Sequence, residues 1–131
     1  MQNLSFEEAE VLRERAEAFL LEAERLYREG NYDPAAFNLE QYCQLILKYK
    51  LLVKTGTYPR THSLIRLLRD LSKLHRGISG LIEGEENILF LTKLEDAYIG
   101  ARYLPRRYRE EEVKAMLRFV KEVFKPSVDR V

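Results

Sequence analysis

Apolar residues recur at helical spacing along almost the whole chain, and this pattern constrains the fold more than any other feature. It is clearest in the first 30 residues, where one apolar stripe repeats every three or four positions: Ala9, Leu12, Ala16, Phe19, Leu20, Ala23, Leu26 and Tyr27. Strict alternation of apolar and polar residues, which is typical of a half-buried strand, is absent. We therefore expect an all-α fold, an antiparallel bundle of about five helices.

Capping residues and glycines indicate where the first two helices begin and end. A capping-box spacing that starts at Ser5 opens the first helix, and Gly30 is placed to end it. Asp33 followed by Pro34 suits the cap and first position of the second helix. That helix is apolar almost all round between Tyr42 and Val53, so we expect it to be the central and most buried one, and Gly56 stops it.

The second half of the chain predicts three more helices. Thr61 is a candidate cap for the third, and three glycines at positions 77, 80 and 84 then leave a loop or a short turn of helix. The fourth helix is expected from about Glu86 to Leu104. The fifth starts at the glutamates 110–112, which favour a helix N-terminus, and runs toward Pro126.

Composition limits the classes of protein that this chain can represent. Its 131 residues suit one domain, 1–131, with one modest core. The net charge of +1 argues against coating of nucleic acid by the whole surface, so any anion site must be local. The single cysteine, the lack of a secretory signal and the lack of a long apolar run predict a cytoplasmic protein without membrane contact. Few thermolabile residues beside many charged ones indicate a thermophilic source.

The stretch from Asp96 to Tyr108 mixes arginine with tyrosine where Pro105 forces the backbone out of helical geometry. It provides four arginines and three tyrosines as candidate ligand residues: Arg102, Arg106, Arg107, Arg109, Tyr98, Tyr103 and Tyr108. Guanidinium groups suit phosphate oxygens, and aromatic faces suit bases or sugars. The alternative is structural: a chain of i,i+4 contacts from Glu95 through Tyr98 to Arg102 that closes the helix, followed by a solvated basic loop.

This stretch resembles the signature of the HEPN family, the helical domain named for higher eukaryotes and prokaryotes nucleotide-binding. Three further segments fit the same family: 37–42, 51–56 and 58–64. The resemblance implies a homodimer that binds a nucleotide or an RNA end. It also implies a minimal nucleotidyltransferase as partner protein in a two-component system of the toxin–antitoxin kind.

The resemblance raises the possibility of RNA cleavage as well. Nuclease members of the family carry an arginine followed after four to six residues by a histidine, and cleave RNA without metal at the dimer interface. Arg102 matches that arginine, but the residue six positions later is Tyr108, and no histidine follows it. A phenol is a poor proton shuttle at neutral pH. Binding therefore ranks above cleavage, with Arg102 and Tyr108 as catalytic candidates, and a pure protein-interaction scaffold is the third reading.

The other reactive residues offer weaker candidates. Arg60 and His62 are expected either as auxiliary contacts to the tyrosine–arginine cluster or, for His62, as a polar residue in the first turn of the third helix. Arg69 and His75 repeat the arginine–histidine spacing, but such a spacing arises easily by chance in an arginine-rich chain, and a solvated face is the preferred interpretation. Cys43 is expected in the core, and two histidines with one cysteine predict neither a metal site nor a cofactor.

Overall fold

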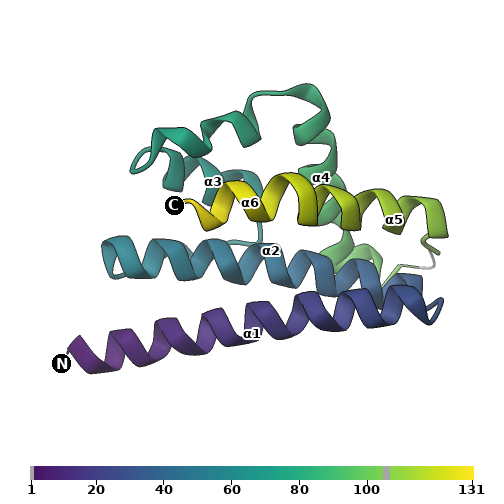
Figure 1. Cartoon of the computed structure of the whole chain (residues 1–131), viewed down its shortest axis with the longest axis horizontal. Helices are drawn as coiled ribbons and strands as arrows, with labels where there is room; N and C mark the ends of the chain where they lie inside the picture. The colour runs from purple at the N-terminus through teal and green to yellow at the C-terminus, as the bar shows by residue number, and fades with distance from the viewer. Residues whose placement is uncertain (1, 105–106) are drawn as a thin grey trace.

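The computed structural model describes residues 2–104 and 107–131, which form helices and turns without any strand (Figure 1). In chain order the helical elements are α1 (Gln2–Arg28), α2 (Tyr32–Thr55), α3 (Leu64–Ser72), the 3₁₀-helix η1 (Arg76–Ile82), α4 (Glu85–Gly100), α5 (Glu110–Phe119), the π-helical segment η2 (Val120–Phe124) and α6 (Lys125–Asp129). The prediction of an all-α helical bundle is confirmed.

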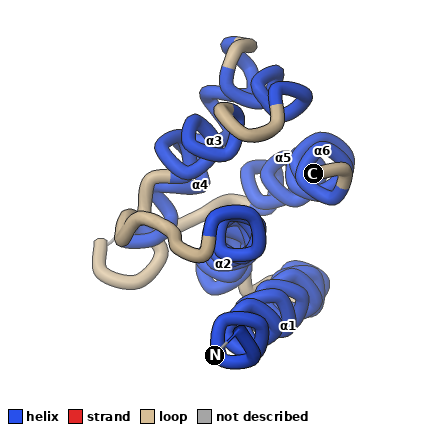
Figure 2. Tube along the Cα trace, turned by 90° about the vertical axis from the view of Figure 1, so that its left-hand side faces the viewer, coloured by secondary structure: helices blue, strands red, loops and turns tan. Residues whose placement is uncertain are grey.

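Helix α2 lies at the centre of the bundle. It pairs along its length with α1, and it also contacts α3, α4 and α5. In both ribbon views α1 lies on one side of α2, whereas α3 and α4 lie on the other side (Figure 2). Helices α5 and α6 follow each other almost in line and run beside α2 (Figure 1). This arrangement agrees with the expectation that the second helix is the most buried one.

The core is built from leucines and aromatic rings around α2. Leu39, Tyr42, Cys43 and Leu47 of α2 are buried against the apolar face of α3 and against Phe124 of η2. The Tyr42 and Phe124 rings meet edge to face, with centroids 6.0 Å apart. Cys43 is a core residue, as predicted, and its burial raises the pKa of the thiol.

Several predicted helix starts are wrong by a few residues. Helix α1 begins at Gln2, ahead of Ser5. Asn31 precedes α2, while Asp33 lies inside its first turn and accepts a hydrogen bond from a distant backbone amide. Ser63, and not Thr61, caps α3, since its Oγ accepts from the Arg66 amide at 3.1 Å.

The helix ends were easier to predict where glycine is required. Gly30 and Gly56 follow α1 and α2 with φ of 83° and 84°, a left-handed geometry that glycine adopts without strain. Helix α4 stops at Gly100, earlier than the expected Leu104. The last helical stretch passes Pro126 by way of η2 and α6 and reaches Asp129. Within the described residues every helix is too short or too polar to cross a lipid bilayer.

Candidate functional site

Arg102 lies in the turn that follows α4, enclosed by three aromatic rings. Its guanidinium carbon is 4.6 Å from the ring centroids of each of Phe37, Tyr98 and Tyr103. Its Nε donates a hydrogen bond to the Tyr98 carbonyl at 3.0 Å. Phe37 comes from the start of α2, so two distant segments hold one cation in place. The side chain remains exposed, which leaves the other guanidinium N–H groups accessible to an anion.

No acidic residue within the described segments forms an ion pair with Arg102. The predicted alternative placed Glu95 at the acidic end of an i,i+4 chain, and the structure contradicts that part of it. Glu95 Oε2 instead accepts hydrogen bonds from Ser63 Oγ at 2.8 Å and from the Ile65 amide at 3.1 Å. The carboxylate thus closes the first turn of α3. The other parts of the alternative are present: Arg102 stacks on Tyr98 and donates to its carbonyl at the end of α4, and Arg107 and Arg109 after it are exposed. These contacts leave the charge of Arg102 without an acidic partner in the described residues.

His62 joins this cluster from the turn before α3. Its ring stacks on the Tyr98 ring with a centroid separation of 3.9 Å and an interplanar angle of 24°. Both rings border a groove of about 770 Å³ that runs along α4 toward Leu104. Arg60, expected beside His62, is exposed and makes no hydrogen bond, ion pair or ring contact with the described part of the cluster.

The two other tyrosines of the cluster have opposite environments. Tyr103 is exposed over the Arg102 guanidinium. Tyr108 is only 5% exposed and belongs to the core, although part of it borders the groove. The Tyr108 backbone amide donates to Asp33 Oδ1 at 2.7 Å, which fixes this residue against α2. Arg106, also predicted for the cluster, lies outside the described residues.

A buried carboxyl group near the site was not predicted from the sequence. Glu40 of α2 is fully buried, and its two oxygens accept hydrogen bonds from the side-chain amides of Gln41 and Gln44, both at 2.7 Å. Lys48 Nζ donates to Gln44 Oε1 at 2.9 Å. Burial raises the pKa of Glu40 to about 7, against the lowering effect of the two hydrogen bonds and of the charges on Lys48 and Arg102. A glutamate just before the apolar run of this helix, directly after the apolar Leu39, was the signal that could have revealed it.

The remaining candidates are dispersed. In the described residues no three histidine, cysteine or acidic side chains gather closely enough to hold a metal ion. Helix α3 ends at Ser72, between Arg69 and His75, and His75 lies at the start of η1. The side chains that the structure does bring together are therefore the aromatic and cationic ones around Arg102.

A helical bundle with an arginine–tyrosine cluster after its fourth α-helix agrees with the comparison to known families. The family model described as HEPN domain matches residues 9–131. The chain belongs to the HEPN family. The resemblance noted in the sequence is thereby confirmed over nearly the whole chain, and HEPN membership supports a module that handles nucleotides or RNA. A comparison with proteins of curated function found no match.

Proposed function

We propose that this HEPN protein binds a nucleotide or the end of an RNA strand at the Arg102 cluster. The observation that supports this most is an exposed guanidinium held by three aromatic rings without a carboxylate partner in the described chain. A cation that only closes a helix does not need three rings to orient it. A preorganised planar fork loses little side-chain entropy when it binds phosphate oxygens.

The aromatic side chains around Arg102 provide faces for the nucleoside. Tyr103 is exposed, and the stacked pair of His62 and Tyr98 borders the groove along α4. Stacking of a base on an aromatic ring contributes about 1–3 kcal/mol and tolerates any base. A phosphate on Arg102 and a base on one of these rings would suit a terminal nucleotide, with little selectivity for its sequence.

We further propose that the protein is a homodimer that pairs through the outer side of α4. Three apolar side chains on α4 and in the turn after it are largely exposed: Leu89 at 70%, Ile99 at 51% and Leu104 at 57%. Exposed apolar patches of this kind are typical of interfaces between proteins. Because Arg102 follows the same helix, such pairing would bring the two nucleotide sites of a dimer near each other.

The partner protein and the setting rest on membership of the family. We propose that a minimal nucleotidyltransferase acts beside this chain in a cytoplasmic system of the toxin–antitoxin kind. The unpaired Arg102 argues against the alternative that the protein is a scaffold, which would bind only that partner and no ligand. Copurification of the two proteins, with and without a saturating mononucleotide, distinguishes a ligand-dependent complex from a simple scaffold.

Metal-independent RNA cleavage is the second candidate function, and the position of His62 favours it. The sequence lacks a histidine after Arg102, but folding places the His62 imidazole on Tyr98, the same ring that contacts the guanidinium. An imidazole titrates near neutral pH and can transfer a proton, while an arginine stabilises charge on the phosphate. In this case His62 would do the work of the histidine that follows the arginine in nuclease members and is missing from this sequence.

One incubation tests both candidates. Labelled single-stranded RNA is mixed in EDTA with the wild type, Arg102→Ala, His62→Gln and Tyr108→Phe, and both retention and cleavage are measured. Binding alone predicts retention without cleavage, lost in Arg102→Ala and kept in Tyr108→Phe, because Tyr108 is mainly a core residue. Cleavage by the wild type that His62→Gln abolishes would favour the second candidate. Equal retention by Arg102→Ala would contradict both.

A further inference from the structure

The outer side of α3 and its flanking turns hold a concentration of positive charge. Between residues 57 and 82 the sequence contains a single aspartate and no glutamate, against five exposed cations: Arg60, Arg66, Arg69, Lys73 and Arg76. The whole chain has a net charge of only +1. This segment is therefore distinctly basic, while the rest of the molecule is acidic on balance.

The buried side of α3 determines where these cations point. Leucines at positions 64, 67, 68 and 71 fill the core. Arg66, Arg69 and Lys73 follow the i,i+3,i+7 spacing of one helix face and lie on the opposite, exposed side. In the described residues the only ion pair on this face joins Lys73 to Asp70 at 3.8 Å, and the arginines have none.

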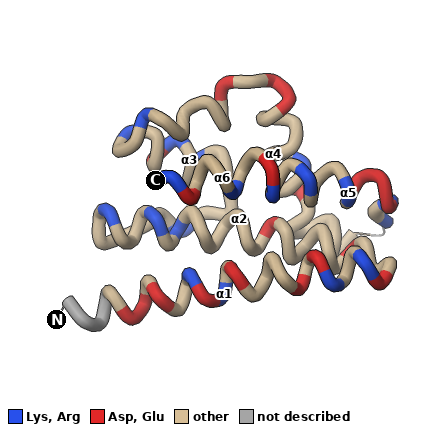
Figure 3. The backbone as a smooth tube through the Cα atoms, in the orientation of Figure 1, with Lys and Arg blue, Asp and Glu red and all other residues tan. Residues whose placement is uncertain are grey.

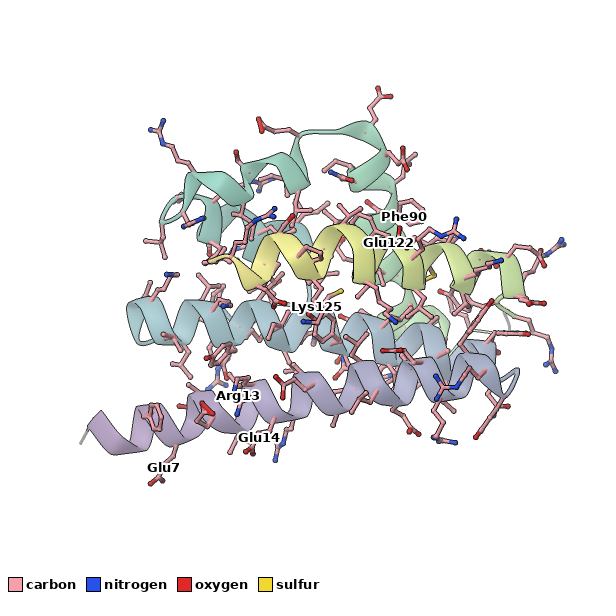
Figure 4. All side chains as sticks on the ribbon, in the orientation of Figure 1. Glu7, Arg13, Glu14, Phe90, Glu122 and Lys125 are labelled. Atoms are coloured by element: carbon pink, nitrogen blue, oxygen red, sulfur yellow. The ribbon has the colours of Figure 1, made fainter. Side chains whose placement is uncertain are left out.

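Helix α1 shows the opposite arrangement on the far side of α2. Acidic and basic residues are interspersed along it (Figure 3), and glutamates outnumber arginines. Arg13 pairs with Glu10 at 2.8 Å and with Glu17 at 3.0 Å, and Arg25 pairs with two more glutamates. Glu14 of α1 extends away from the bundle (Figure 4). On α1 the ion pairs neutralise Arg13 and Arg25, and the two other arginines, Arg15 and Arg28, lie among an excess of glutamates, whereas the unpaired arginines of α3 have a single acidic neighbour, Asp70.

The N-terminus of α3 adjoins the candidate nucleotide site. His62 immediately precedes the Ser63 cap of α3, and its ring stacks on Tyr98, which in turn contacts Arg102. Arg66 and Lys73 are about 10 Å apart along the helix axis, which matches roughly three stacked nucleotides. One strand could thus have its end at Arg102 and its backbone over α3.

We propose that the outer face of α3 carries the phosphate backbone of a single-stranded RNA whose terminal nucleotide occupies the Arg102 site. The assignment of the terminal nucleotide rests on the proposed function, whereas the backbone track rests on the charges of α3. Single-stranded RNA fits better than a duplex, because aromatic faces such as Tyr103 and His62 stack on bases only when these are unpaired. Arginines bind the phosphates without reading the sequence.

The test compares a mononucleotide with a longer strand. Binding of AMP and of a labelled oligo(A) of about 12 nucleotides is measured for the wild type, Arg66→Gln/Arg69→Gln, and Arg102→Ala over a series of salt concentrations. The matched control is Arg15→Gln/Arg28→Gln, which removes two exposed charges from α1. Circular dichroism checks that each variant is folded.

The α3 variant is expected to bind oligo(A) about tenfold more weakly near 0.1 M salt, with AMP affinity and the α1 control unchanged. The slope of log K for oligo(A) against log salt concentration should become shallower by about 1.4, since each lost single-strand phosphate contact removes about 0.7.

Unchanged oligo(A) binding by the α3 variant, with binding of both ligands lost in Arg102→Ala, would refute the backbone track on α3 and leave the proposed function intact. If only the α3 variant loses oligo(A) binding, and Arg102→Ala still binds AMP, the proposed function is refuted and the backbone track on α3 stands. Displacement of oligo(A) by polyglutamate of equal length, as readily as by unlabelled oligo(A), would assign α3 to an acidic protein and refute the RNA proposal.

Discussion

The backbone amide of Tyr108 and the carboxylate of Asp33 form a 2.7 Å hydrogen bond between residues 75 positions apart. The bond fastens the segment before α5 to the first turn of α2, next to Phe37 on the same helix. Asp33 therefore fixes Tyr108, which borders the same groove as Tyr98, against the helix that carries Phe37.

Asp33→Ala should lower the free energy of unfolding by about 1–3 kcal/mol, because it leaves a partly buried amide without its acceptor. Asp33→Asn keeps an acceptor oxygen and should lose less than half of that amount. Urea unfolding followed by circular dichroism measures both values. Equal and negligible losses in the two variants would mean that the bond contributes nothing to stability.

Glu40 should make stability depend on pH. Its pKa in the folded protein is about 7, above the ordinary 4.5 of a glutamate, so folding favours the protonated form. The resulting stability is fully present below about pH 4.5 and is lost as the pH rises through about 7, with a total change on the order of 3 kcal/mol.

Glu40→Gln removes this ionisable group with little change of shape. Its unfolding free energy should therefore fall less than that of the wild type between about pH 5 and about pH 8, a range that includes the pKa of about 7. Glu14→Gln, which removes an exposed glutamate from α1, is the control and should follow the wild-type curve. Parallel curves for wild type and Glu40→Gln would refute the assignment.

Gly56→Ala should destabilise the protein by about 1–2 kcal/mol, because a side chain at φ 84° is strained even where space is available. Gly80→Ala is the matched control: Gly80 has no positive φ and no atom within 4 Å of the added methyl group. Thermal melts of the two variants measure the difference. Equal melting temperatures would contradict the helix-ending role of Gly56.

Features that depend on local sequence were predictable. The all-round apolar run of the second helix indicated its central place, and Gly56 marked its end, because both depend only on neighbouring residues. The predicted cap at Asp33 was wrong because its carboxylate accepts from Tyr108, a contact that spacing along the chain does not reveal. The predicted Glu95 ion pair was wrong for the same reason, since that carboxylate is used by α3.

The site was predictable in part. Arg102, Tyr98 and Tyr103 are neighbours in sequence, so their grouping follows from helical spacing and the turn after it. His62, one of the predicted auxiliary contacts, reaches the same cluster from the turn before α3. Phe37 reaches it from α2, and this was not predicted because only tertiary packing places it there. Tyr108 looked equivalent to the other tyrosines in sequence, but its ring is in the core, because the Asp33 bond and the start of α5 turn it inward.

Calorimetric titration of a mononucleotide into the wild type, Arg102→Lys and Arg102→Ala tests the central claim most directly. If three rings orient a planar guanidinium toward phosphate, lysine should restore little, and both variants should bind about 10- to 100-fold more weakly than the wild type. Their melting temperatures should stay close to that of the wild type, since the side chain is exposed. Wild-type affinity in Arg102→Ala would contradict the account.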